Sequence, residues 1–244
     1  MAKLNPVFSG IKTDEAINDV ASFKGVTLKT VILLGVALLS AYLGVVYGAV
    51  AILSNPFIYL LVVVGAVVCG IVGQMNPNAA CVCSILYSIC EGIILGLVSF
   101  LFEGMVQGII LSAILVTFTI FGVMLLLYST NIVRVTGRFL RVMSSLGITI
   151  LVVSLVYFIS YLFNPNNILV TTLVNNTGLM LLVSGIILLY GAFMLALDFE
   201  QINQIVSNGF DKKYEWTAAL GLMVTLIWIY VEALRILAIF AKRD

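Results

Sequence analysis

The chain has 244 residues, of which 62% are hydrophobic and only 9% are charged, and its mean hydropathy is +1.21. A soluble domain carries roughly 25% charged residues, so this composition predicts an integral membrane protein rather than a water-soluble globule. The net charge of +1 leaves no basic surface for nucleic acid, which we exclude as a partner. The absence of histidine removes the commonest metal ligand and the usual general base.

Seven apolar segments are long enough to cross the hydrocarbon core of a bilayer, which takes about 20 residues of α-helix. Clusters of asparagine and proline, which favour turns, separate several of these segments. We therefore predict an all-α integral membrane protein. A polar N-terminal arm (residues 1–28) precedes a seven-helix transmembrane domain (residues 29–244), and the lipid bilayer is its expected surrounding. In chain order, the predicted spans cover residues 30–53, 57–73, 79–102, 108–128, 142–163, 178–202 and 216–240.

The distribution of lysine and arginine predicts the orientation, because these residues resist translocation across the membrane. They occur in the N-terminal arm, between the fourth and fifth spans and between the sixth and seventh spans, whereas the opposite loops hold none. We therefore expect a multi-pass protein of the plasma or inner membrane with a cytoplasmic N-terminus. An odd number of spans places the C-terminus outside. Lys242 and Arg243 there depart mildly from the rule, and one re-entrant span would return the C-terminus to the cytoplasm.

Three arginines stand between the fourth and fifth spans. Arg134, Arg138 and Arg141 follow the spacing i, i+4 and i+7, which predicts one helical face. The plainer interpretation is a positively charged cytoplasmic anchor. The alternative is a short interfacial helix that holds anionic lipid headgroups.

Small residues recur at a spacing of four within several spans, for example at Gly92 and Gly96. Such a pattern lets helices approach closely in lipid, so we interpret these glycines mainly as packing residues. A flexible gate at Gly92 and Gly96 is the alternative.

Few ionisable residues lie inside the spans, and each costs at least about 2.5–3.5 kcal/mol at the centre of a membrane helix. Glu91 lies in the middle of the third span, and Asp198 lies near the cytoplasmic end of the sixth. Thr225, Glu232 and Arg235 share one face of the seventh span, where Glu232 and Arg235 are close enough to pair. Each acid has two interpretations. In the structural one, its polar atoms have partners within the bundle and the residue serves packing. In the functional one, it senses protons or cations.

The sequence has no G-x-S-x-G, H-E-x-x-H or P-loop motif, so we predict neither an enzyme nor a bound cofactor.

Three stretches resemble the Bax inhibitor-1 family. The sequence ALDFEQI at residues 196–202 resembles the end of its sixth helix, and residues 214–235 resemble its seventh helix, which also ends in Leu-Arg. Glu91-Gly92 followed by Leu95-Gly96 is similar to the third helix of the bacterial YccA-like branch. The order and spacing of these short motifs, together with the seven spans, extend the resemblance over most of the chain.

The resemblance implies a bundle with a central helix and a calcium leak that responds to pH. In the bacterial form two aspartates on helices six and seven share a proton. Two neighbouring carboxylates cannot both ionise cheaply in a low dielectric, so they form a switch. Asp198 takes the first position, but Thr225 stands at the second and cannot titrate. The sensor is therefore either rebuilt around Asp198, Glu91 and Glu232, or the gating differs.

We accordingly expect a pH-sensitive leak channel for Ca²⁺ or other cations. Asp198 is the expected cytoplasmic gate and Glu91 the mid-membrane group, and both would contact Ca²⁺ transiently as the permeant ion. Glu232 is the expected outer gate residue, on the same face as Thr225 and paired with Arg235. The alternative is a non-conducting regulatory protein, because YccA-like relatives associate with a membrane-bound ATP-dependent protease. The N-terminal arm would then bind the partner. A purely structural bundle is a third hypothesis.

Overall fold

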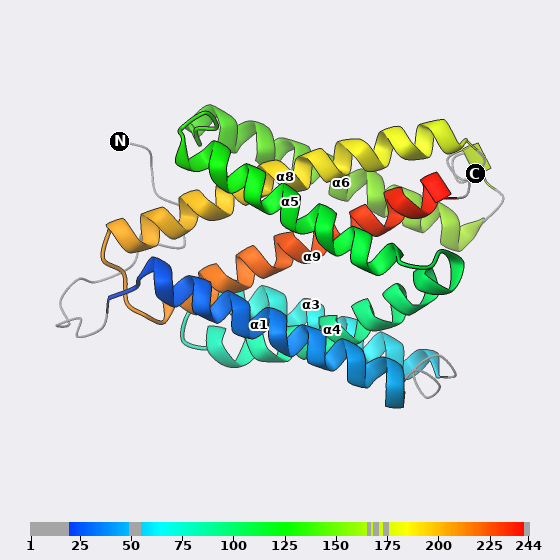
Figure 1. The fold of residues 1–244 in the computed structure, drawn as a ribbon, viewed down its shortest axis with the longest axis horizontal. Coiled ribbons are helices and arrows are strands. Elements are labelled where there is room, and N and C mark those ends of the chain that lie inside the picture. The colour runs from blue at the N-terminus through cyan, green and yellow to red at the C-terminus, as the bar shows by residue number, and fades with distance from the viewer. Residues whose placement is uncertain (1–19, 49–54, 165–166, 168–170, 173–175, 242–244) are drawn as a thin grey trace. The chain divides into compact units, whose positions relative to one another are not determined.

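The computed structural model describes residues 20–48, 55–164, 167, 171–172 and 176–241. Within these residues seven helices are long and apolar enough to cross a membrane, which confirms the predicted all-α architecture. Figure 1 shows the helices in chain order. They are α1 (Phe23–Leu43) with the π-helical turn η2 (Gly44–Gly48), α3 (Pro56–Met75), α4 (Ala80–Met105), α5 (Ile109–Ser129), α6 (Gly137–Phe163), α8 (Thr177–Ser207) and α9 (Tyr214–Ala241).

The first helix begins at Phe23, so the last part of the predicted polar arm, residues 23–28, is helical. Ser22 caps this helix, because its Oγ accepts a hydrogen bond of 3.0 Å from the backbone N–H of Gly25. Hydropathy placed the start too late because Lys24 and Lys29 interrupt the apolar run. Residues 1–19 of the arm, residues 49–53 of the predicted first span and the C-terminal Lys242 and Arg243 lie outside the described residues.

Local signals set two other helix starts. The Asn55 side chain accepts a hydrogen bond of 3.1 Å from the backbone N–H of Phe57, and Pro56 occupies the first position of α3. Gly108 precedes α5 with φ of +80°, a left-handed backbone that glycine adopts without steric cost. These residues account for the two breaks in the hydrophobic pattern.

The predicted helical face of three arginines is wrong. Thr136 has an extended backbone, and its Oγ1 accepts a hydrogen bond of 3.2 Å from the backbone N–H of Phe139, so α6 begins only at Gly137. Arg134 therefore lies in the turn before the helix, whereas Arg138 and Arg141 belong to α6 itself. The alternative of a separate short interfacial helix is therefore wrong, because this turn and the first turns of a 27-residue span take its place.

The chain divides into two compact units. Unit 1 comprises Met1–Gly104 and Asp198–Val224, and unit 2 comprises Met105–Leu197 and Thr225–Asp244. Unit 1 therefore contains α1, α3, α4, the end of α8 and the beginning of α9. Unit 2 contains α5, α6, the remainder of α8 and the remainder of α9.

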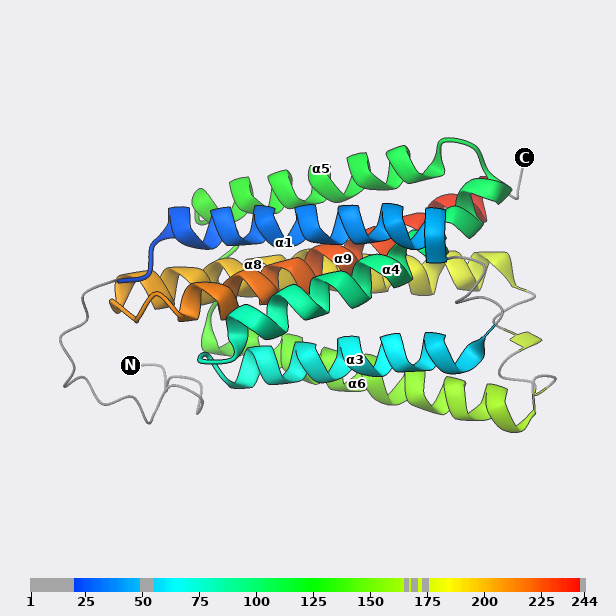
Figure 2. The same cartoon turned by 90° about the horizontal axis from the view of Figure 1, so that it is seen from below.

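In unit 1, glycines bring α1 and α4 into backbone contact. A Cβ atom on Gly92 would collide with Ser40 Oγ and the carbonyl of Ala37, and a Cβ atom on Gly96 would lie 2.9 Å from the Cα of Ala41. The two glycines are therefore packing residues in this structure, which agrees with the first of the two interpretations. Figures 1 and 2 also show α1 running beside the first half of α9.

In unit 2, aromatic side chains connect the helices. Phe139 of α6 meets Phe193 of α8 edge to face, with ring centroids 6.0 Å apart. Tyr190 of α8 packs against Trp228 of α9, with ring centroids 5.7 Å apart. A Cβ atom on Gly191 would lie 3.0 Å from Ile229, so α8 and α9 approach closely here.

The spans differ widely in how much of their surface is buried. In the most apolar 18-residue segment of each span, the buried share is 61% in α9, compared with 11% in α3 and 6% in α6. A span that is largely buried packs mostly against other helices, whereas α3 and α6 expose most of their apolar surface, as lipid-facing helices do.

Candidate functional site

Asp198 lies in α8 at the point where this helix enters unit 1. The residue is buried, with 8% of its surface exposed, and its helix neighbours Leu195, Ala196 and Phe199 are buried as well. Its Oδ1 lies 3.8 Å from the position that a Cβ atom on Gly221 of α9 would take. This is an ordinary van der Waals distance, so the carboxylate lies beside α9 at Gly221. Asp198 is therefore buried in the protein, on the side of α8 that faces Gly221 of α9.

Glu91 lies on α4 in unit 1 and is half-buried. The next residue, Gly92, is in contact with α1, and the buried Tyr87 lies one turn earlier on the same side of α4. Among the residues that the structure describes, none forms an ion pair or a hydrogen bond with the Glu91 carboxylate. The structure thus places Glu91 in the same unit as Asp198 but shows no direct bond between them.

Glu232 and Arg235 form an ion pair on α9 in unit 2. Arg235 Nη1 lies 3.2 Å from Glu232 Oε2, and the Glu232 side chain is 3% exposed while that of Arg235 is 46% exposed. Glu232 also forms a side-chain hydrogen bond with Ser184 of α8, which is itself buried. This carboxylate is neutralised and bonded in place. Thr225, seven residues earlier on α9, is buried at 5% exposure.

Sequence reasoning missed a buried carboxylate with several partners. Glu215, in the first turn of α9, is 1% exposed and lies 2.7 Å from the ammonium group of Lys29 on α1. The backbone N–H of Ser22 donates to Glu215 Oε1 over 2.8 Å, and the Ser22 hydroxyl lies 3.2 Å from the same oxygen. The ammonium group also donates to the carbonyl of Lys212 and lies 5.1 Å from the ring centre of Trp216.

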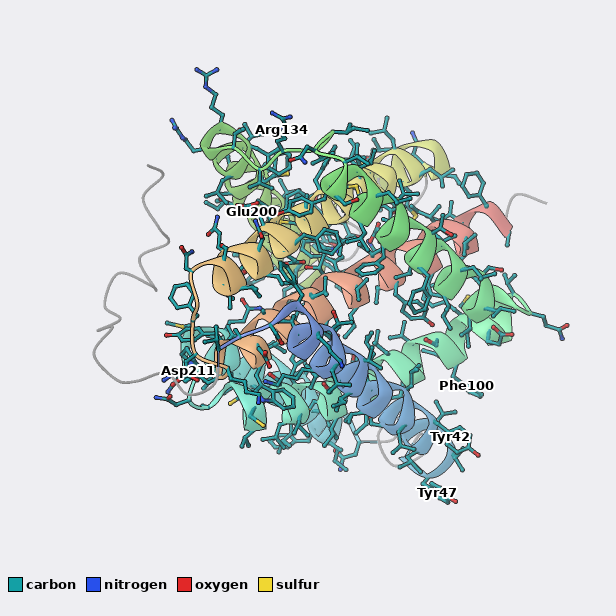
Figure 3. All side chains as sticks on the ribbon, turned by 60° about the vertical axis from the view of Figure 1, so that its left-hand side comes forward. Tyr42, Tyr47, Phe100, Arg134, Glu200 and Asp211 are labelled. Atoms are coloured by element: carbon teal, nitrogen blue, oxygen red, sulfur yellow. The ribbon has the colours of Figure 1, made fainter. Side chains whose placement is uncertain are left out.

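This group of residues, which we call the α1–α9 clamp (Ser22, Lys29 and Glu215), also requires Gly25. A Cβ atom on Gly25 would collide with the Glu215 carboxylate, so glycine gives the acid its space. Beside the clamp, the backbone N–H of Ala21 donates to the carbonyl of Phe210 over 2.8 Å. These bonds fix the start of α1 to the turn between α8 and α9. Asp211, which is labelled in Figure 3, belongs to this turn. The sequence shows a lysine in the first helix and a glutamate at the start of the last, but no local pattern connects the two.

The described residues contain no group of three or more Cys, Asp or Glu side chains close enough to hold a metal ion. Asp198 and Glu91 therefore offer single carboxylates. Such groups suit brief contacts with a passing cation better than a tight Ca²⁺ site, which takes six to eight oxygen ligands.

Seven apolar helices with buried carboxylates define a multi-pass membrane protein. A protein-family model described as Bax inhibitor 1 like matches residues 5–242, which is nearly the whole chain. The chain therefore belongs to the Bax inhibitor 1 like family, and the predicted resemblance is confirmed. Comparisons with curated proteins and with solved structures gave no match.

Proposed function

We propose that this protein is a leak channel that lets Ca²⁺ or other cations cross a cell membrane, plasma or inner, at a rate that depends on pH. Family membership supports the proposal, and one observation carries it: Asp198 is a carboxylic acid buried inside a membrane helix, against a glycine of the neighbouring helix. A buried carboxylate is costly unless it is protonated, hydrogen-bonded or close to a cation. Its state therefore responds both to protons and to cations.

The proposed mechanism follows from that cost. When Asp198 is protonated, the end of α8 packs closely against α9 at Gly221. When the proton leaves, the charged carboxylate is more costly to bury, and the two helix segments separate to admit water or a cation. Oxygen ligands suit hard cations such as Ca²⁺, so the open form attracts the permeant ion.

The other acids have different parts in this proposal. Glu91 is the second group that protons and cations reach, because no described residue neutralises it. Glu232 is neutralised by Arg235, so we assign it to the outer end of the bundle as a structural and gating residue. Thr225 cannot titrate. The proton switch therefore depends on Asp198 and Glu91 rather than on a pair of aspartates.

The test is Ca²⁺ flux into liposomes that contain the purified protein, measured at pH 6 and at pH 8. Asp198→Asn removes the titrating proton while it keeps the size of the side chain, so we expect the ratio of the two fluxes to approach one. The matched control is Asp211→Asn, because Asp211 belongs to the same unit but has a side chain that is 46% exposed and forms an ion pair of 3.5 Å with Lys213. We expect this control to keep the pH dependence of the wild type.

Two outcomes would contradict the proposal. If Asp198→Asn left flux and its pH dependence unchanged, Asp198 would not be the gate. If the wild type gave no flux above that of empty liposomes at either pH, the leak itself would be wrong. The regulatory hypothesis, in which the protein binds a membrane-bound ATP-dependent protease or another partner, would then take its place.

A further inference from the structure

One stretch of the chain has an unusual distribution of charge. Between Glu103 and Asp198 the sequence contains no acidic residue, and its only charged residues are Arg134, Arg138 and Arg141. All three lie within eight consecutive residues at the junction of α5 and α6. We call this set the arginine junction. Its positive charge has no counter-charge in the same stretch of chain.

The side chains of the arginine junction are accessible to a ligand. All three arginines are exposed, and none forms an ion pair with a residue that the structure describes. Arg134 is held by one hydrogen bond of 3.1 Å from its Nε to the carbonyl of Asn131, which leaves its terminal nitrogens free to bind. Figure 3 shows Arg134 at the turn between α5 and α6. Arg138 and Arg141 are three residues apart in the first turns of α6, so they are neighbours on its surface.

Apolar side chains are interleaved with the arginines. Ile132 is 71% exposed, Leu140 is 51% exposed and Val142 is 54% exposed. The junction directly joins the ends of two spans, α5 and α6, so these residues lie where headgroups meet acyl chains. A free phosphate ion would gain nothing from exposed isoleucine and leucine, whereas a lipid would contact both kinds of side chain. The ligand class that fits is therefore a lipid with an anionic headgroup.

The use of arginine rather than lysine distinguishes this junction from a segment that only sets the topology. The N-terminal arm and the turn between α8 and α9 carry lysine and no arginine. Lysine and arginine serve equally to hold a loop in the cytoplasm. The planar guanidinium group, however, binds two oxygens of one phosphate side by side, which an ammonium group does not.

We propose that the arginine junction is a binding site for the phosphodiester headgroup of an anionic membrane lipid. Arg134 binds it from the turn, and Arg138 and Arg141 bind it from α6. Ile132 and Leu140 contact the acyl chains. The site lies in unit 2 and is independent of the proposed leak through Asp198.

The test uses the purified full-length protein in a neutral detergent, with phosphatidylglycerol or phosphatidylcholine added. Native mass spectrometry and thermal unfolding measure lipid binding. The key variant is R134K/R138K/R141K, which keeps the charge and therefore the topology. We expect the wild type to prefer phosphatidylglycerol. We expect the variant to bind it roughly three- to tenfold more weakly, because the bidentate contacts are lost. R134K alone, which leaves α6 unchanged, should give a smaller loss in the same direction.

Controls distinguish the lipid site from general charge. K212R/K213R makes the reverse exchange at the turn between α8 and α9, and it should leave lipid binding unchanged. Three results would overturn the proposal. The first is equal binding of phosphatidylglycerol by the wild type and by both lysine variants. The second is a gain of binding in K212R/K213R, because position would then not matter. The third is equal protection by inorganic phosphate, which would identify a site for a free anion.

Discussion

The contact of Glu215 with Lys29 is an ion pair inside the protein rather than on its surface. The Glu215 side chain is 1% exposed and that of Lys29 is 13% exposed, so both charges have lost most of their contact with water. Such a pair adds little to stability compared with two apolar residues, but removal of one partner leaves a buried charge without compensation. Ser22 adds two hydrogen-bond contacts to the same carboxylate, which fixes its position.

We predict that Glu215→Gln lowers the free energy of unfolding by up to about 3 kcal/mol, because Lys29 then lacks its counter-charge and escapes only partly toward water. Thermal unfolding of the purified protein in detergent measures the change. Lys213→Gln is the matched control, since Lys213 and Asp211 form an exposed pair, with side chains 42% and 46% exposed. We expect the control to change stability by less than about 0.5 kcal/mol. Equal effects of the two substitutions would contradict a special role for the clamp.

At this scale the sequence predicted which acids lie inside spans, and it predicted a partner only where that partner is close by in the chain. Glu232 and Arg235 are three residues apart, so their pairing could be read from helix geometry. Lys29 and Glu215 lie in different helices far apart in the chain, and no local pattern connects them. The same limit applies to Asp198, whose position against Gly221 depends on the packing of α8 against α9.

Among the helices, the contact between α1 and α4 depends on the absence of side chains. A Cβ atom on Gly96 would lie 2.9 Å from the Cα and 3.0 Å from the carbonyl carbon of Ala41. These are backbone atoms of α1, which cannot move aside as the end of a flexible side chain can. The spacing of small residues predicted such a contact but could not say which helix would supply the partner.

We predict that Gly96→Ala destabilises the protein by about 1–3 kcal/mol, because the added methyl group pushes α1 and α4 apart. The control is Gly104→Ala on the same helix, where a Cβ atom would meet nothing within 4 Å. Alanine favours helix over glycine by roughly 0.5–1 kcal/mol, so the control should be neutral or slightly stabilising. Thermal unfolding in detergent compares the two variants. Unchanged stability in Gly96→Ala would mean that the two helices are not closely packed.

Hydrophobicity predicted the existence of every span, whereas capping residues decided where the helices begin. Ser22 starts α1 within the charged end of the predicted arm, and Thr136 starts α6 ahead of its apolar run. A window of hydropathy detects the part of a helix that lies in hydrocarbon. It does not detect the polar turns at each end, which are stabilised by caps and by interfacial lysine or arginine.

For the whole molecule, the family and the seven spans were predictable because both depend on patterns that extend along the entire chain. The orientation is a proposal that rests on the lysine and arginine of three segments. The α1–α9 clamp adds a geometric argument. It fixes the start of α1 to the turn between α8 and α9, so these two lysine-bearing segments lie at the same end of unit 1. The positive-inside rule requires this, since both segments must face the cytoplasm.

We predict that the turn between α8 and α9 is cytoplasmic and that the turn between α4 and α5 is outside. Single cysteines at exposed positions test this in a variant whose four native cysteines, all within spans, are replaced by alanine. A membrane-impermeant maleimide should label Gln107→Cys in intact cells, because this turn holds no lysine or arginine. Asn208→Cys should be labelled only after the membrane is permeabilised. The reverse labelling pattern would mean that the orientation of the protein in the membrane is opposite to the predicted one. The arginine junction would then lie in the outer leaflet and Asp198 near the outer end of its span. Labelling of both positions in intact cells would mean that both turns lie outside. The three helices between them, α5, α6 and α8, would then not cross the membrane an odd number of times.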